Sequence, residues 1–186
     1  MSYKEAITRF EEKMNVVLEV QKKEFAGVRT GRANPSLLDR IHVDYYGTLT
    51  PLTQLATVST PDPKTLAVTP WDKGMLAKVE KAILASDLGL TPTNDGNVVR
   101  MSLPHLTEER RKDLVKLVKK IAEDMRVAIR NVRRDAVDAV KKQEKDGLIT
   151  EDELKRAQDE IQKITDKHIA DVDKTLTTKE TEIMQV

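Results

Sequence analysis

The sequence predicts an α+β protein in which a small α+β domain is inserted between the first and second helices of an elongated three-helix bundle. All seven prolines and five of the seven glycines lie between Gly31 and Pro104. On both sides of this segment, apolar residues recur at the three-to-four spacing of amphipathic helices. Within it, short alternating runs are typical of strands. Helix-breaking residues are therefore confined to one inserted domain.

The first helix is expected over residues 3–28, and the second begins after Pro104. Thr107 and the two glutamates that follow it favour a helix start. The pattern continues for about forty residues to Gly147, a residue suited to a helix C-terminus. One side of the first helix carries the apolar residues Ile7, Phe10, Met14, Val17, Leu18, Phe25 and Val28.

Thr150 and Glu153 have the spacing of a capping box and are expected to begin the third helix. Only residues 146–149 separate it from the second helix, which favours an antiparallel pair within one chain. Heptad-like spacing alone would also allow an intermolecular coiled coil. The inner side of the third helix is predicted to contain Leu154, Ala157, Ile161, Ile164, Val172, Leu176 and Ile183.

The inserted segment is expected to combine short strands with one helix. The predicted helix covers residues 74–88, and Asp95 with Gly96 forms a hairpin-type turn. We expect Tyr45 and Tyr46 to pack as an aromatic pair in the small core, with Trp71 in a similar role. The predicted strands are residues 41–45, 56–59, 65–69 and 97–102.

Charge is separated along the chain, although its net value is only +1. Residues 105–145 contain 13 Lys and Arg against 8 Asp and Glu, or +5, whereas residues 146–186 contain 6 against 11, or −5. In the second helix, one face carries six cations and one carboxylate. Arginines on a rigid helix suit phosphate groups, although a solvated helix face is the alternative. This row comprises Lys112, Lys116, Lys119, Glu123, Arg126, Arg130 and Arg133.

Several classes of function are disfavoured by what the sequence lacks. Without cysteine, disulfides and thiolate chemistry are excluded. The chain has neither a phosphate-binding loop nor a nucleophile elbow, and the three histidines, His42, His105 and His168, are far apart in sequence. No apolar run is long enough for a membrane helix or a signal peptide. A cytoplasmic protein that is not an enzyme and needs no cofactor or metal is expected.

The chain enters and leaves the inserted domain once each, so two connections are expected between the domains. We predict a bundle domain of residues 1–30 and 105–186 and a small domain of residues 31–104. Gly31 can absorb a change of backbone conformation, and Pro104 stiffens the return path. The predicted hinge residues are Thr30, Gly31, Arg32, Leu103, Pro104 and His105.

Five specific sequence blocks span nearly the whole chain. They are VRTGRANPSLLD at 28–39, VDYYGTLTPLTQLA at 43–56, VEKAILASDLGLTP at 79–92, LTEERRKDL at 106–114 and RNVRRDA at 130–136. In content and order, these blocks resemble the ribosome recycling factor family. Several specific blocks agree rather than one short motif.

The short connection between the second and third helices favours a monomer. The resemblance implies an L-shaped, tRNA-sized molecule whose bundle binds the large ribosomal subunit, mainly through ribosomal RNA. Elongation factor G with GTP would then drive subunit separation. A helical scaffold or a general RNA-binding protein is the alternative. Arg110 and Arg111 are secondary candidates for RNA binding, because Glu108 and Glu109 could pair with them locally. The main predicted RNA-binding residues are Arg133, Arg130, Arg29, Arg126 and Lys119.

Overall fold

The computed structural model describes residues 2–185, so Met1 and Val186, the ends of the predicted bundle domain, lie outside the described residues. The chain divides into two compact units. One contains the chain up to Val28 together with Asp113–Thr181, and the other contains Arg29–Lys112 together with the chain from Glu182. The start of the second long helix and the end of the third thus belong to the second unit.

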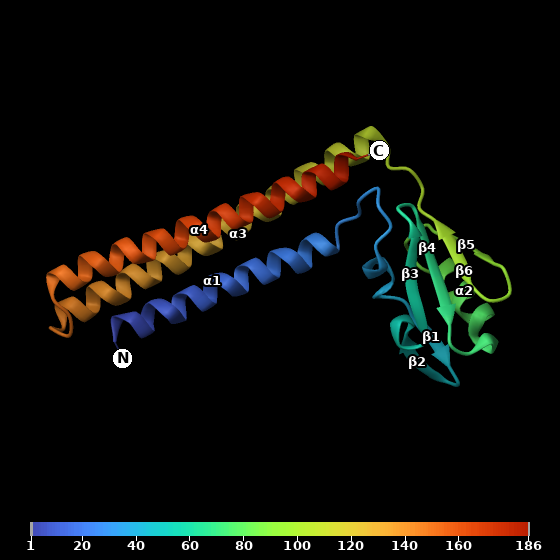
Figure 1. Cartoon of the computed structure of the whole chain (residues 1–186), viewed down its shortest axis with the longest axis horizontal. Coiled ribbons are helices and arrows are strands. Elements are labelled where there is room, and N and C mark those ends of the chain that lie inside the picture. Colours follow the sequence, from blue (N-terminus) through green and yellow to red (C-terminus); the bar gives the residue numbers. More distant parts are fainter. Residues whose placement is uncertain (1, 186) are drawn as a thin grey trace. The chain divides into compact units, whose positions relative to one another are not determined.

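Three long helices build the first unit, as the sequence predicts: α1 (Tyr3–Ala26), α3 (Glu108–Lys145) and α4 (Glu151–Met184) (Figure 1). The predicted capping box is confirmed, because the Glu153 amide donates to Thr150 Oγ1 at 3.2 Å and the Thr150 amide donates to Glu153 Oε2 at 2.8 Å. Gly147 has φ 73°, a value that suits glycine in the turn between the two helices.

Apolar residues from all three helices meet in the bundle core. Near the turn between α3 and α4, a buried cluster is formed by Ile7, Ala136, Val140, Ala157 and Ile161. Each lies on the side of its helix that the apolar spacing marks as internal.

A polar pair, in which His168 is buried and Asn15 is exposed, also joins α1 to α4. His168 Nδ1 lies 2.7 Å from the carbonyl oxygen of Ile164, and its Nε2 lies 2.8 Å from Asn15 Oδ1. One turn further along, buried Gln21 donates to the Val172 carbonyl at 3.2 Å. These hydrogen bonds fix the register of the two helices, because a shift would leave buried polar groups without partners.

The second unit contains a four-stranded antiparallel sheet, a separate two-stranded hairpin and one short helix. The sheet order is β3-β4-β6-β5, and α2 packs against β1, β5 and β6 (Figure 1). The elements are β1 (His42–Tyr45), β2 (Thr48–Pro51), β3 (Ala56–Asp62), β4 (Thr65–Pro70), α2 (Leu76–Leu84), β5 (Thr91–Asn94) and β6 (Val99–Ser102), with short 3-10 turns at Pro35–Leu38, Leu52–Gln54 and Lys73–Met75.

Two strands and the length of the helix differ from the sequence prediction. β2 and β5 are only four residues long and rich in Thr and Pro, so their strand conformation depends on pairing with β1 and β6. The helix is shorter than residues 74–88, because a 3-10 turn precedes Leu76 and the chain leaves the helix after Leu84.

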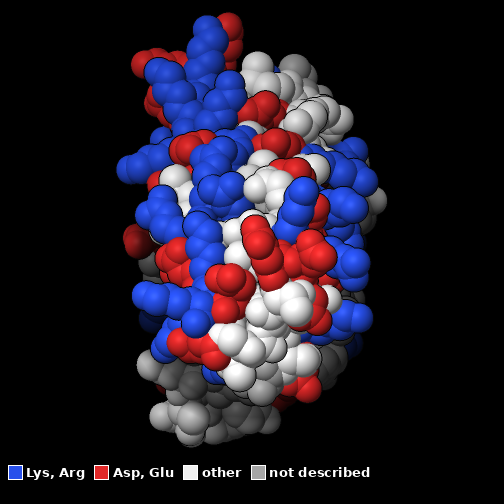
Figure 2. Space-filling model, turned by 90° about the vertical axis from the view of Figure 1, so that its left-hand side faces the viewer, with Lys and Arg blue, Asp and Glu red and all other residues white. Residues whose placement is uncertain are grey.

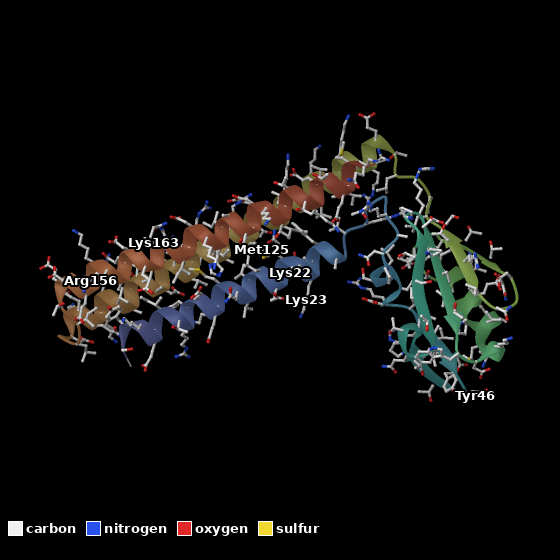
Figure 3. All side chains as sticks on the ribbon, in the orientation of Figure 1. Lys22, Lys23, Tyr46, Met125, Arg156 and Lys163 are labelled. Carbon is white, nitrogen blue, oxygen red and sulfur yellow. The ribbon has the colours of Figure 1, made fainter. Side chains whose placement is uncertain are left out.

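The aromatic side chains do not pack as predicted. Tyr46 is 75% exposed and Trp71 is 69% exposed, whereas aliphatic residues fill the core of this unit. Tyr46 and Gly47 turn the β1–β2 hairpin with φ values of 48° and 86°, so Tyr46 lies at the tip of the hairpin (Figure 3). The prediction of a buried aromatic pair with a similarly packed Trp71 was wrong for this reason.

Candidate nucleic-acid interface

The cationic row predicted from the sequence lies on α3. Its lysines, Lys112, Lys116 and Lys119, are exposed, as is Arg130, whereas Arg126 and Arg133 are partly buried on the side that faces α4. A long helix without proline holds these side chains at fixed intervals, which suits binding to a regularly spaced polyanion. The interactions of each cation within the protein decide how much of its charge is available.

Arg126 is neutralised within the bundle. Its Nε donates to Asp173 Oδ1 at 2.8 Å, and its second terminal nitrogen lies 2.7 Å from the same oxygen. A further donor reaches Glu123 Oε2 at 2.8 Å, and the side chain is only 20% exposed. The hydrogen bond to Asp173 raises the pKa of Arg126, and Glu123 adds to this. The geometry therefore indicates a structural tie between α3 and α4 rather than a free phosphate ligand.

Arg133 also reaches α4, but its partner there is uncharged. Its terminal nitrogen donates to Gln162 Oε1 at 3.1 Å, and Gln162 in turn donates to Asp166 Oδ1 at 2.8 Å. Its Nε is buried and has no hydrogen-bond partner within the described chain. An amide fixes the position of the guanidinium without cancelling its charge. Arg133 is therefore held in place and remains able to bind an anion.

Arg130 and Lys119 have long ion pairs. Arg130 lies 3.5 Å from Glu123 and is 49% exposed, and Lys119 lies 3.8 Å from Glu180. Exposed pairs of this length contribute little and exchange easily for another anion. Arg130 can therefore turn to a phosphate group at low cost, whereas Lys119 would leave the carboxylate of Glu180, which is only 29% exposed, without the cation it pairs with.

Arg29, Arg110 and Arg111 lie in the second unit. Arg29 donates to the carbonyl oxygen of Pro104 at 3.0 Å, so it joins the two connecting segments of the chain. The local pairing expected for Arg110 and Arg111 is not formed, since Glu108 instead pairs with Lys112 at 2.9 Å and neither arginine forms an ion pair with a described residue. The carboxylate of Glu108 is therefore already engaged in an exposed i,i+4 ion pair.

The predicted hinge segments are tied to their surroundings. The Arg32 amide donates to Thr30 Oγ1 at 3.3 Å, and the Leu103 amide donates to the Lys64 carbonyl at 2.8 Å. A methyl group on Gly31 would meet the carbonyl oxygen of Gln185 at 3.2 Å, so close packing also favours glycine there. Motion about these residues remains a prediction.

The cations of the α3 row have partners on α4 that could not be predicted from the sequence. Asp173 and Glu180 pair with cations of α3, and Gln162 positions Arg133. No local motif could indicate these contacts, because the partners lie 29 or more residues apart. Figure 2 shows the end of the bundle that contains the turn between α3 and α4, where Lys and Arg (blue) and Asp and Glu (red) are intermixed.

The described part of the chain lacks two other kinds of site. It contains no group of three or more His, Asp or Glu side chains placed to hold a metal ion. None of its helices combines the length and hydrophobicity needed to cross a lipid bilayer. The row on α3 is therefore the candidate site that these residues support best.

Comparison with known proteins relates the chain to one family throughout its length. The family described as "Ribosome recycling factor" matches residues 21–184. A ribosome-recycling factor of Carboxydothermus hydrogenoformans is 58% identical over 173 residues, which are 93% of this chain and 94% of that protein. A ribosome-recycling factor of Bacillus subtilis is 54% identical over 183 residues, covering 98% and 99% of the two chains.

Solved structures show the same likeness. A solution structure of a ribosome recycling factor matches with a TM-score of 0.77 and 43% identity, covering 100% of this chain and 99% of the other. A second match comes from models for the T. thermophilus ribosome recycling factor and the E. coli elongation factor G bound to the E. coli post-termination complex. Its TM-score is 0.69 and its identity 52%, with both chains fully covered.

Proposed function

Because the chain belongs to the ribosome recycling factor family, we propose that it binds the post-termination ribosome and, with elongation factor G and GTP, promotes separation of the subunits. Its likeness to a relative that was placed with elongation factor G on a post-termination complex supports both partners. It would work in the cytoplasm, as a binding factor rather than an enzyme, and carry no cofactor.

Arg133 is the residue that we propose anchors the chain to ribosomal RNA. Its guanidinium is fixed by the neutral amide of Gln162, so its charge remains available to a ribosomal RNA phosphate. Arg130 and Lys119 extend the same row with weakly paired charges. RNA helices present phosphates and 2′-hydroxyls that such side chains can bind without reading sequence.

The proposed mechanism uses the two units differently. The bundle stays anchored to RNA on the large subunit, while elongation factor G moves the small domain of residues 31–104. The segments at 30–32 and 103–105 absorb this motion. The displaced domain then disrupts the contacts between the subunits.

Light scattering of purified post-termination ribosomes tests the proposal. Elongation factor G, GTP and the wild-type chain should together produce a loss of scattering that none of them produces alone. Arg133→Ala should reduce the rate about tenfold or more, as expected when a hydrogen bond to a charged group is lost. Arg156→Ala is the matched control, since it removes one exposed arginine of α4 that forms no ion pair with a described residue (Figure 3).

Other outcomes would favour the alternatives. A folded chain that neither binds nor splits ribosomes, but self-associates in sedimentation equilibrium, would be a helical scaffold. A chain that binds unrelated RNA as tightly as ribosomes would be a general RNA-binding protein. Equal loss of splitting in Arg133→Ala and Arg156→Ala would show that net charge, rather than the α3 row, determines binding.

A further inference from the structure

Half of the aromatic residues gather on one exposed part of the second unit. The chain has one Trp, three Tyr and two Phe, and three of these six are Tyr45, Tyr46 and Trp71. Tyr46 and Trp71 are largely exposed, and the rings of Tyr45 and Tyr46 meet edge to face with centroids 4.7 Å apart. The remaining three aromatics are at least partly buried in α1. Exposed aromatic clusters of this kind are typical of binding surfaces.

The backbone beneath this cluster is strained. Tyr46 has φ 48°, and no other described residue except glycine has a positive φ. Asparagine or glycine would occupy this turn position at lower energy. A bulky residue kept in such a conformation points to a function for its side chain.

A small cavity opens beside the cluster. It has a volume of about 300 Å³, with Tyr45 and Trp71 at its sides and Leu55 and Met75 among its apolar lining. Trp71 is fixed at both ends, since its amide donates to the Leu55 carbonyl and its indole Nε1 donates to Thr57 Oγ1, each at 3.1 Å. The part of the cavity wall that Trp71 forms is therefore preorganised.

The polar lining of the cavity carries negative charge. Asp72 accepts the Gly74 amide at 2.9 Å and the Tyr46 hydroxyl at 3.3 Å, and it forms no ion pair with any described residue. Gln54 and Thr50 also line the cavity. The charge of Asp72 raises the pKa of Tyr46. Such a site repels a phosphate group but attracts a cation.

An arginine side chain matches both the apolar and aromatic lining of this cavity and its negative charge. Its aliphatic stem packs on apolar and aromatic surfaces, and its planar guanidinium stacks on aromatic rings while it donates to a carboxylate. We propose that the cavity formed by Tyr45, Trp71 and Asp72 is a socket for an arginine from a basic loop of a partner protein. This socket is separate from the cationic row on α3 and is suited to a protein rather than to nucleic acid.

Fluorescence of Trp71 tests the proposal directly, because it is the only tryptophan in the chain. The full chain is titrated with the peptide acetyl-Gly-Arg-Gly-amide and, separately, with the same peptide carrying citrulline, an uncharged analogue of arginine. We expect a saturable change with arginine and an affinity about fivefold or more lower with citrulline, since charge-assisted hydrogen bonds are the stronger ones.

Two substitutions should move this affinity in opposite directions. Asp72→Asn keeps an acceptor for the Gly74 amide but removes the charge, and should weaken binding of the arginine peptide about fivefold. Gln54→Glu adds a carboxylate to the cavity and should strengthen it. Asp87→Asn, an exposed change outside this cavity, should leave the affinity unchanged.

Three results would overturn the proposal. They are the absence of a saturable change with the arginine peptide, equal affinities for the arginine and citrulline peptides, and affinities in Asp72→Asn and Gln54→Glu that match the wild type. If a ten-nucleotide single-stranded RNA displaced the arginine peptide from Trp71, as read from its fluorescence, the aromatic cluster would be assigned to base stacking instead.

Discussion

Two arginines of α3 differ in how much of their charge remains available, because their hydrogen-bond partners differ. Arg126 faces the carboxylates of Asp173 and Glu123, whereas Arg133 faces the amide of Gln162. Carboxylates neutralise a guanidinium, while an amide only orients it. The sequence places both in a single cationic row and cannot separate them, because their partners on α4 lie far along the chain.

This difference predicts that two substitutions affect stability unequally. Arg126→Ala should lower the free energy of unfolding by about 1 kcal/mol, because its ion pairs are only partly shielded from solvent. Arg133→Ala should leave stability nearly unchanged, since it gives up one exposed hydrogen bond to a neutral group. Urea unfolding followed by circular dichroism measures both. A larger loss in Arg133→Ala than in Arg126→Ala would contradict the assignment.

Tyr46 offers a second test at the scale of one residue. Tyr46→Asn should raise the free energy of unfolding by about 1 kcal/mol, because asparagine tolerates the left-handed conformation better. Tyr46→Ala is the matched control, since it also removes the ring but keeps the backbone cost. Thermal unfolding compares the two variants. Equal melting temperatures would show that the turn stores no strain.

At the scale of elements, the long helices and their caps were the most predictable parts. Apolar spacing, the Thr150–Glu153 capping box and Gly147 mark their limits locally. β2 and β5 could not be predicted in this way, because their strand conformation depends on partners in β1 and β6. Of the candidate site, the sequence predicts the row on α3 but not the partners on α4 that pair with it.

The polar pair between α1 and α4 should contribute strongly to the bundle. His168→Ala should lower the free energy of unfolding by roughly 2–4 kcal/mol, because it creates a cavity at a buried position and removes the hydrogen bond to Asn15. His42→Ala, at an exposed position of β1, is the control. Equal urea midpoints for the two variants would show that the pair is not needed.

The β5–β6 hairpin should be sensitive to acid. The amides of Asn97 and Val98 lower the pKa of Asp95, and the charge of Arg100 adds to this. A lowered pKa in the folded state stabilises the protein above the unfolded value, near pH 4, and that contribution is lost as pH falls through the folded value.

Asp95→Asn should therefore lose less stability than the wild type between neutral pH and about pH 3. Asparagine still offers an oxygen to the two amides of the turn, so the hairpin should be kept. Urea midpoints measured at both pH values provide the comparison. Identical losses in the two proteins would contradict the role given to Asp95.

At the scale of the whole molecule, a nearly neutral chain separates its charges between helices. Residues 105–145 carry +5 and residues 146–186 carry −5, yet the acids of α4 pair with only some of the cations on α3. The proposed binding to ribosomal RNA would give the cationic face a role, and the contacts with α4 indicate which of its members remain available. Available charge, rather than net charge, should therefore determine ribosome binding.

The affinity for isolated large ribosomal subunits, measured at several salt concentrations, tests this claim most directly. Wild type, Arg133→Ala and the control Arg156→Ala would be compared. We predict that only Arg133→Ala weakens binding, by about tenfold, and that it lowers the salt dependence by about one phosphate contact. An unchanged affinity and salt dependence in Arg133→Ala would contradict the account.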